Sequence, residues 1–173
     1  VCHADPQGDW AATMIALHGY LVVQGPKGKR NIEMKDFVLG PYANSLNYNE
    51  IAIEAVIPAP KGVARGGYLK LERRVGDFAT ASVAVSLDMS GDTVLGAGFA
   101  LAGVGGKTID ANDAASALIG QKLTDATIAK AAALVAAKAE PRTDHRGSAE
   151  YKRHIIETFV KRILLANSAQ KVA

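Results

Sequence analysis

The sequence predicts an α+β protein built from two units joined by a short linker. Alternating apolar residues in the second unit predict an antiparallel sheet, and apolar residues at helical spacing after it predict a group of helices. The segment PAPKGVARGG, residues 58–67, holds two prolines and three glycines, which is typical of a linker. We therefore divide the chain into residues 1–57, a linker at 58–66, and residues 67–173.

The sequence of the first unit predicts a helix, a hairpin, a helical turn and a strand, in that order. Asp9 is the expected N-cap of the helix, and Gly19 is its expected stop. In the last strand, alternation places four apolar side chains on one face, which are Ile51, Ile53, Ala55 and Ile57. The expected elements are a helix at 10–18, strands at 21–23 and 31–34 around a turn at 24–28, a helical turn at 36–39 and a strand at 50–57.

The sequence of the second unit predicts a three-stranded antiparallel sheet followed by three helices. Three glycines in the third strand, Gly96, Gly98 and Gly103, indicate close approach of another backbone. The strands are expected at 68–71, 78–87 and 93–104, with a tight turn at 90–92.

The three helices are predicted from their caps and their apolar spacing. The first is expected at 111–119, and the second begins after Thr124 as N-cap and continues to 139. The third begins after Ser148 and carries an apolar stripe at steps of four, formed by Tyr151, Ile155, Phe159 and Ile163.

The composition limits the classes of function. The 173 residues are 49% hydrophobic with a net charge of +3, and no basic block is interleaved with aromatic residues, so nucleic-acid binding is not favoured. The one cysteine, Cys2, cannot form an internal disulfide or hold a zinc or iron–sulfur site, which favours a cytosolic location. The longest apolar run, 94–106, is too short to span a bilayer, so no transmembrane segment is expected.

The segment HADPQGDW, residues 3–10, is the first candidate site. A turn that leads into a helix offers free backbone N–H groups, and Asp5 and Asp9 add two carboxylates. Carboxylates suit hydroxyl-rich ligands, such as a ribityl chain, and repel phosphate. The structural alternative is that Asp5 orders the turn and Asp9 caps the helix, and the residues alone favour this alternative.

The segment YLKLERR is the second candidate. Alternation places Tyr68, Lys70 and Glu72 on one face of a strand. A tyrosine beside a lysine can stack on a flat heterocycle and offer it charge or a hydrogen bond, but the same pattern also suits a solvated strand face. Both interpretations stay open on the residues alone. No nucleophile elbow or similar motif supports a hydrolase, and the glycines at 103–106 lack nucleotide-binding spacing.

Three blocks of sequence resemble, in order, the FAD-carrying medium subunits of molybdenum hydroxylases. The blocks are ADPQGDW, DFVLGPYANSLNYNEIAIEAVIPAP and GGYLKLERRVGDFATASVAVSL. The third is the most specific, since its K-L-x-R-R-x-G-D-[FY]-A pattern is similar to the aerobic carbon monoxide dehydrogenase type rather than the xanthine dehydrogenase type. The stretch after it and the closing helix SAEYKRHIIETFVKRIL extend the resemblance over nearly the whole chain.

The resemblance implies which parts of the family's fold are present. Residues 1–57 would form the back half of an FAD-binding α/β domain, and residues 67–173 a C-terminal domain of the carbon monoxide dehydrogenase flavoprotein type. The glycine-rich segments that bind phosphate in the family lie N-terminal to the ADPxGD motif, and the sequence does not contain them. Val1 is not an initiator methionine, so we expect a fragment or a split subunit that needs the missing N-terminal half of the FAD domain as a partner.

The resemblance also implies an oxidoreductase subunit that is not active alone. FAD would take electrons from the iron–sulfur clusters of a small subunit and pass them to an external acceptor. A large subunit with the molybdenum cofactor would oxidise the substrate, with carbon monoxide expected first and aldehydes or N-heterocycles still open. The complex is expected in the cytoplasm, including at the inner face of the membrane.

Five residues of this sequence match cofactor-binding positions of the family. Asp9 would bind the ribityl chain, and Asp5 would shape the same turn. Leu46 would contact the isoalloxazine edge through its backbone, Tyr68 would stack on the isoalloxazine, and Lys70 would lie near it. No catalytic or metal-binding residue is implied. The alternative hypothesis is a non-enzymatic remnant or subunit-interaction module that keeps the fold without bound flavin.

Overall fold

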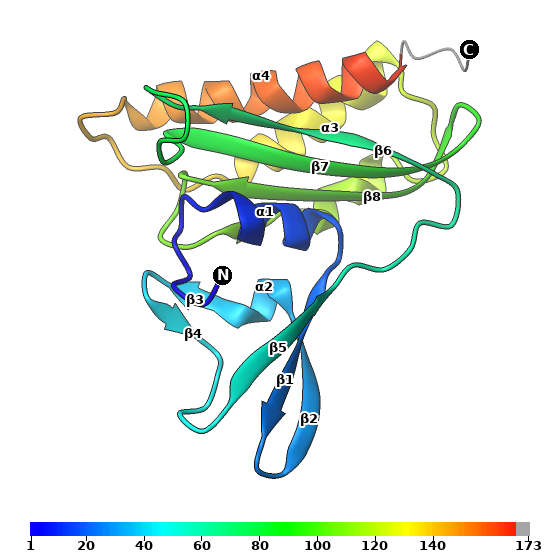
Figure 1. The fold of residues 1–173 in the computed structure, drawn as a ribbon. Coiled ribbons are helices and arrows are strands. Elements are labelled where there is room, and N and C mark those ends of the chain that lie inside the picture. Colours follow the sequence, from blue (N-terminus) through cyan, green and yellow to red (C-terminus); the bar gives the residue numbers. More distant parts are fainter. Residues whose placement is uncertain (169–173) are drawn as a thin grey trace.

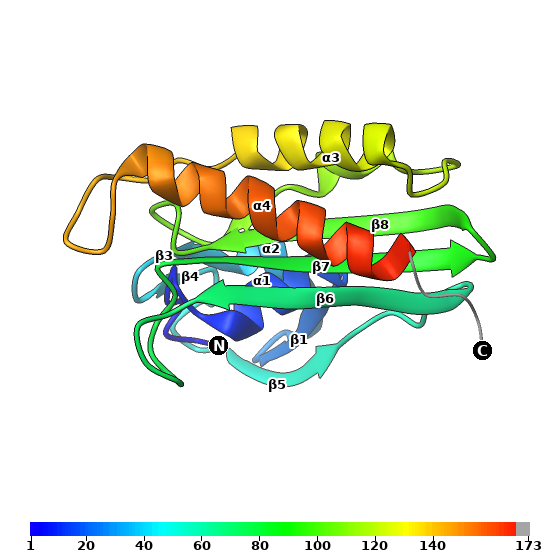
Figure 2. The same cartoon turned by 90° about the horizontal axis from the view of Figure 1, so that it is seen from above.

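A four-stranded antiparallel sheet lies between helices in the computed structural model, which describes residues 1–168 (Figure 1). Two long helices cover one face of this sheet, and a short N-terminal helix packs on the other, as the view from above also shows (Figure 2). The strand order is β6-β7-β8-β9. The strands are β6 (Val63–Leu71), β7 (Ala81–Ser90), β8 (Thr93–Ala102) and β9 (Ile109–Asp110), and the helices are α1 (Asp9–Ala16), α3 (Asp125–Ala137) and α4 (Ala149–Ser168).

The two faces of this sheet carry side chains of different size. Large apolar residues on one face form a core with α3 and α4, and they include Val83, Val85, Leu87, Phe99 and Leu101. The buried residues that the opposite face contributes to the core under α1 are all alanines, which are Ala84, Ala100 and Ala102. Because both faces are covered, β7 and β8 are buried along most of their length.

The alanine face allows α1 to approach β8 very closely at Gly98. A Cβ atom built on Gly98 would collide with the carbonyl oxygen of Ala16, so only glycine fits there. Next to this contact, Asn112 Nδ2 donates a hydrogen bond to Ile15 O (3.2 Å), and Asn112 Oδ1 accepts one from Phe99 N (2.7 Å). The close backbone approach expected from the glycines is therefore confirmed at Gly98.

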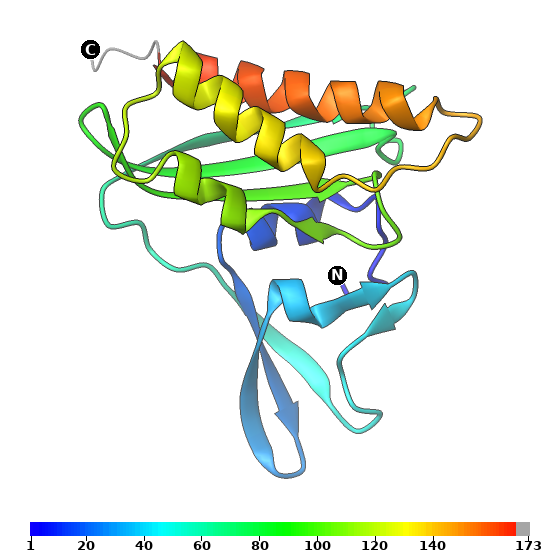
Figure 3. The same ribbon diagram turned by 180° about the vertical axis from the view of Figure 1, so that it is seen from behind.

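A second, smaller sheet projects away from these layers (Figures 1 and 3). Its order is β2-β1-β5, and β1 and β2 form a hairpin with Gly25 paired to Gly28. The helix α2 follows the hairpin and packs under α1. The elements are β1 (Tyr20–Gly25), β2 (Gly28–Glu33), α2 (Met34–Phe37), a ribbon of β3 (Val38–Gly40) and β4 (Ala43–Asn44), and β5 (Ile51–Val56).

The isoleucines of β5 are exposed. Ile51 is 64% exposed, Ile53 is 47% exposed, and Ile57 just beyond the strand is 52% exposed. The prediction that alternation places the apolar residues of this strand on one face is wrong, because the β1–β5 register shifts at Ile53. Ile51 pairs with Gln24, whereas Ala55 pairs with Leu21 and so lies on the other face of the sheet. No residue among 1–168 covers the exposed isoleucines. None of the helices in this part of the chain is both long and apolar enough to cross a membrane.

The structure corrects several expectations in the first unit. The N-cap of α1 is Gly8, and Asp9 is the first helical residue, because its carboxylate is drawn to other partners described below. The helical turn expected at 36–39 begins two residues earlier, directly after the hairpin. The ribbon formed by β3 and β4 was not expected, since its two strands are too short to show alternation.

Further corrections concern the linker and the second unit. The range taken as linker contains the start of β6, because residues from Val63 onward pair with β7. The strand expected from 78 begins at Ala81, and β9 adds a short fourth strand to the sheet. The first of the three expected helices is a 3-10 helix, η1 (Asn112–Ala117), next to α3 and β8 (Figure 3).

The capping predictions for the two long helices are confirmed. The Thr124 side chain accepts a hydrogen bond from Thr127 N (3.3 Å), and Thr127 Oγ1 accepts one from Thr124 N (2.9 Å). Ser148 Oγ accepts a hydrogen bond from Tyr151 N (3.1 Å) at the start of α4. These local bonds satisfy N–H groups that a helix end would otherwise leave free.

Candidate functional site

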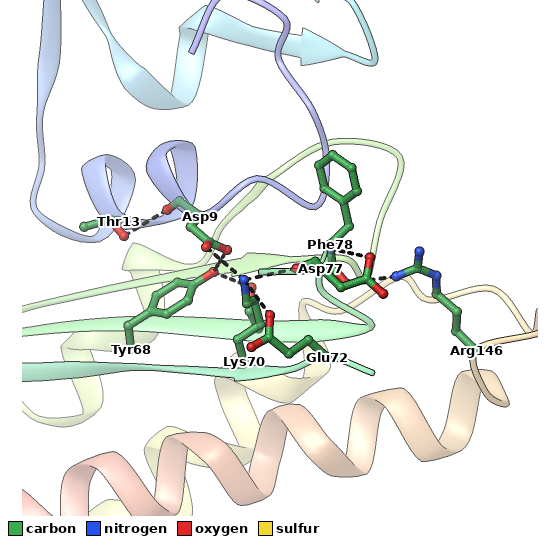
Figure 4. Close-up of polar contacts among 9 residues, drawn as sticks. Asp9, Thr13, Tyr68, Lys70, Glu72, Asp77, Phe78 and Arg146 are labelled. Atoms are coloured by element: carbon green, nitrogen blue, oxygen red, sulfur yellow. Dashed lines mark hydrogen bonds and ion pairs between the residues drawn. The ribbon is translucent and has the colours of Figure 1, made fainter. Parts of the chain in front are cut away.

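Three of the five expected site residues meet at the beginning of α1 (Figure 4). Tyr68 Oη donates a hydrogen bond to Asp9 Oδ1 (2.7 Å), and Lys70 Nζ donates one to Asp9 Oδ2 (3.0 Å). Tyr68 and Lys70 are alternate residues of β6, so their side chains project from the same face of the sheet. The shared face predicted from the sequence is confirmed.

Glu72 completes this group. Its Oε2 atom lies 3.0 Å from Lys70 Nζ, close enough for an ion pair but without the alignment of a hydrogen bond. Lys70 Nζ also donates a hydrogen bond to the carbonyl oxygen of Asp77 (3.1 Å). We refer to Asp9, Tyr68, Lys70 and Glu72 as the Asp9 cluster.

Ser82 and Asp77 support the cluster, and neither was expected from the sequence. Tyr68 Oη lies 2.9 Å from Oγ of Ser82, a fully buried residue of β7. Ser82 faces Lys70 in the β6–β7 register. Alternation places a serine on one face of a strand but does not give the register of the neighbouring strand, so no sequence signal could have identified this contact.

The loop from Glu72 to Phe78 is fastened close to the cluster. Phe78 N donates a hydrogen bond to Asp77 Oδ1 (2.7 Å), and Arg146 donates one to Phe78 O (2.9 Å) from the segment before α4. Figure 4 shows these residues beside Lys70. The carbonyl of Asp77 is thereby held in place to accept from the Lys70 ammonium.

Burial and the neighbouring carboxylates act on two groups of the cluster. Burial raises the pKa of the Tyr68 phenol, and the neighbouring Asp9 carboxylate raises it further. The Glu72 and Asp9 carboxylates beside Lys70 raise the pKa of its ammonium. Near neutral pH Tyr68 is therefore a neutral phenol and Lys70 an ammonium.

A groove opens beside Tyr68, between α1 and β6. Its volume is about 420 Å³. Small residues of β6 and β7 form its floor, and α1 forms one wall. The residues that line this α1–β6 groove are Thr13, Ala16, Leu17, Ala64, Arg65, Gly66, Gly67, Tyr68, Ala84, Val85 and Ser86.

Asp5 orders the turn that precedes α1. Its Oδ1 atom accepts a hydrogen bond from Gln7 N (2.8 Å), and its carbonyl accepts one from Gly8 N (3.0 Å). The turn is tied to the end of β8, because Gly103 N donates to Pro6 O (2.9 Å). Gly103 has a positive φ of 78°, which explains the glycine at this strand exit.

Leu46 lies apart from the Asp9 cluster. Its backbone N–H donates a hydrogen bond to Asn44 Oδ1 (3.0 Å), and its side chain packs at the edge of the core under α1. Within residues 1–168, no hydrogen bond or ion pair joins Leu46 to the cluster. Of the five expected site residues, the structure therefore brings together Asp9, Tyr68 and Lys70.

Comparison with known proteins gives similar relatives over nearly the whole chain. The chain is 36% identical over 166 residues to the carbon monoxide dehydrogenase medium chain of Hydrogenophaga pseudoflava, which covers 96% of this chain and 58% of that one. It is 32% identical over 171 residues to the nicotine 6-hydroxylase medium subunit of Paenarthrobacter nicotinovorans, covering 98% and 59% of the two chains. The chain thus spans less than two thirds of the length of these relatives.

Solved structures and family models agree with these relatives. A carbon monoxide dehydrogenase structure from Hydrogenophaga pseudoflava matches with a TM-score of 0.89 and 38% identity, over 95% of this chain and 57% of that one. Residues 1–60 match the model of the FAD binding domain in molybdopterin dehydrogenase. Residues 67–167, more than half of the sequence, match the CO dehydrogenase flavoprotein C-terminal domain, and the chain therefore belongs to that family.

Proposed function

We propose that this chain is the FAD-carrying part of a molybdenum hydroxylase medium subunit, acting in the oxidation of carbon monoxide. The observation that carries the proposal is the Asp9 cluster at the α1–β6 groove. FAD, when bound, would accept electrons and release them to an external acceptor. The protein's part is to bind the flavin, orient it and set the charge around it.

The groove and the cluster fit a flavin. The floor of glycine and alanine suits a flat aromatic ring, and Tyr68 supplies an aromatic face beside it. Asp9 and Lys70 place opposite charges beside the Tyr68 hydroxyl, where the polar edge of the ring or the ribityl hydroxyls would lie. Each Asp9 oxygen accepts one bond from the protein and keeps lone-pair capacity for a hydroxyl group.

The other two expected residues take more limited roles in this proposal. Asp5 holds the turn that presents α1, and its Oδ1 already accepts from Gln7. The Leu46 N–H already donates to Asn44, so contact of Leu46 with the isoalloxazine would use its carbonyl or side chain. Asp9, Tyr68 and Lys70 therefore form the centre of the proposed site.

The exposed isoleucines of β5 support an association with the N-terminal half of the FAD domain. Ile51, Ile53 and Ile57 are exposed apolar side chains that a further layer of that domain would cover. We also propose the partners implied by the family, an iron–sulfur small subunit and a molybdenum-cofactor large subunit. A cytoplasmic location, including the inner face of the membrane, belongs to the same proposal.

The relatives guide the choice of substrate. Carbon monoxide is named in the Hydrogenophaga relative, whereas nicotine is named in the Paenarthrobacter relative, at a similar identity. The K-L-x-R-R-x-G-D-[FY]-A pattern at 70–79 favours carbon monoxide. Assay of the assembled complex with carbon monoxide, an aldehyde and an N-heterocycle, using an acceptor dye, distinguishes these substrates.

The central test is the flavin content of the assembled complex with variants of Tyr68. Stacking contributes about 0.5–1.5 kcal/mol and burial of the ring about 1.5–3 kcal/mol. Tyr68→Ala should therefore weaken FAD binding by roughly one to three powers of ten, and Tyr68→Phe should retain most of the affinity because it keeps the ring.

Tyr48→Ala provides a matched control, because Tyr48 is fully exposed at 101% and, within residues 1–168, makes no hydrogen bond or ion pair with the cluster. It should leave flavin content unchanged. Full flavin occupancy and normal electron transfer in Tyr68→Ala would show that Tyr68 is an ordinary strand residue.

A non-enzymatic module is the second candidate function. It is favoured by one observation: the Asp9 and Lys70 side chains already satisfy one another, with further contacts to Tyr68, Glu72 and Asp77. Such a cluster can hold α1 to β6 without a ligand. A complex assembled with its N-terminal half but free of yellow, flavin-fluorescent cofactor would support this candidate and reject the first.

A further inference from the structure

The side chain of Asn167, in the last turn of α4, is bonded to the backbone of a single residue in β6. Asn167 Oδ1 accepts a hydrogen bond from Gly66 N (3.2 Å), and Asn167 Nδ2 donates one to Gly66 O (3.2 Å). The same Nδ2 donates to Ile163 O (2.7 Å) within the helix. Asn167 is only 6% exposed, so these bonds are shielded from water.

These bonds occupy the free edge of the sheet. β6 is the edge strand of the order β6-β7-β8-β9, and among residues 1–168 its outward N–H and C=O groups have no further strand to pair with. The carboxamide of Asn167 pairs with Gly66 as a neighbouring peptide would. The Arg65 guanidinium also donates to Asn167 O (3.0 Å), which fastens the end of α4 to the same point of β6.

Gly66 has a backbone conformation that needs such support. Its φ is 140°, and a Cβ atom built there would collide with the carbonyl oxygen of Val85. The next residue, Gly67, leaves just enough space for Ile163 of α4, whose side chain would lie 3.2 Å from an added Cβ. The β6 segment before Tyr68 is therefore held between β7 and the end of α4.

The same segment lines the α1–β6 groove. Gly66, Gly67 and Tyr68 all line that groove, which opens on the α1 side of the sheet. α4 lies on the opposite side (Figure 2). A substitution of Asn167 would alter the groove by shifting the backbone of β6, without direct contact between Asn167 and a ligand.

We propose that Asn167 is a positioning residue for the flavin, because its carboxamide fixes the Gly66 backbone and so sets the place of the Tyr68 ring. This inference rests on the proposed function. It adds a residue at the far end of the chain to the site formed by α1 and β6.

The test compares Asn167→Asp with wild type in the assembled complex. The aspartate has nearly the same shape, but when ionised it cannot donate to Gly66 O, and it would oppose that carbonyl with negative charge. FAD should bind roughly three- to tenfold more weakly, and the visible circular dichroism and fluorescence of the bound flavin should change. These spectra report the surroundings of the isoalloxazine, which a purely structural role would leave unaltered.

Ser168→Ala is the matched control. Ser168 is the next residue, is exposed, and donates to Leu165 O within α4 (2.8 Å). It should leave the flavin spectra and FAD affinity unchanged. If Asn167→Asp does not fold, Asn167→Ser is measured instead, since it keeps a small polar side chain but cannot bridge both Gly66 atoms.

The outcomes separate the two proposals. A wild-type complex without flavin rejects the proposed function. A wild-type complex with flavin, whose spectra and FAD affinity are matched by a folded Asn167 variant, leaves that function intact and overturns the positioning role. Altered spectra in the Asn167 variant together with unaltered spectra in Ser168→Ala support the positioning role.

Discussion

β7 and β5 are both strands with alternating apolar residues, but they meet different surroundings. β7 is buried along nearly its whole length, because α3 and α4 cover one face and α1 the other. In β5 a register shift at Ile53 breaks the alternation, and nothing among residues 1–168 covers the exposed isoleucines. Alternation in the sequence therefore identifies apolar positions, whereas the face that each occupies and the layer that covers it depend on strand register and on the rest of the fold.

The largest expected effect tests this difference in burial. Phe99→Ala removes a fully buried ring from the core under α3 and α4 and should lower the free energy of unfolding by about 3–5 kcal/mol. Ile53→Ala, on β5, should change it by no more than about 0.5 kcal/mol. Denaturant unfolding measures both. Similar losses in the two variants would mean that Ile53 is covered, contrary to the difference in burial between the two strands.

A second variant tests the packing of α1 against β7 and β8. Gly98→Ala adds a Cβ that collides with Ala16 O, so α1 must shift, at an expected cost of about 1–3 kcal/mol in unfolding free energy. Gly106→Ala is the control, because nothing lies within 4 Å of a Cβ built there. A Gly98→Ala variant as stable as this control would show that α1 is not closely seated on β8.

The role of the exposed isoleucines of β5 in association can be tested by replacing them with polar residues. Replacing Ile51, Ile53 and Ile57 together with threonine keeps strand propensity and should lower the binding of a hydrophobic dye. Each position should change the free energy of unfolding by no more than about 0.5 kcal/mol. In the assembled complex, the same variant should bind the N-terminal half more weakly. Unchanged dye binding and unchanged assembly would place the association surface elsewhere.

The smallest effect concerns an ion pair that holds β2 to the segment before β5. Arg30 Nη2 donates to Glu50 Oε2 (2.7 Å), and this contact, together with a hydrogen bond from Asn47 N, lowers the pKa of Glu50 from 4.5 to about 2. A carboxyl with a lowered pKa stabilises the fold above its unfolded pKa, and this contribution is lost as the pH falls from 4.5 toward about 2.

Glu50→Gln removes that contribution. Wild type should therefore be more stable than the variant near pH 6, and the difference should vanish by about pH 2 in denaturant unfolding at each pH. A difference that stays constant down to pH 2 would show that the carboxylate charge does not matter.

Local features were the most predictable part of the fold. The caps at Thr124 and Ser148 depend on residues three positions apart, so the sequence alone was sufficient to identify them. Gly98 was recognised as a close-approach position, although its partner α1 was not. Asp9 was expected as a cap because acidic residues favour that position, but distant partners on β6 hold its carboxylate.

The candidate site was predictable only in part, for the same reason. The common face of Tyr68 and Lys70 follows from alternation within one strand. Ser82 and Asn167 contribute through strand register and helix packing, which connect residues far apart in the sequence. Ser82 lies outside the K-L-x-R-R-x-G-D-[FY]-A pattern at 70–79, and Asn167 lies outside the three blocks that carry the resemblance, so only the three-dimensional arrangement identifies these two residues.

The contact between α1 and β8 has a consequence for the order of folding. The hydrogen bond from Asn112 to Ile15 joins residues 97 positions apart, whereas β7 and β8 are neighbours across a tight turn. Loop-closure entropy makes distant contacts form later than local ones. The β7–β8 hairpin is therefore the expected early structure, and docking of α1 the late step. Although α1 is synthesised before β8, it can dock only after that strand has formed.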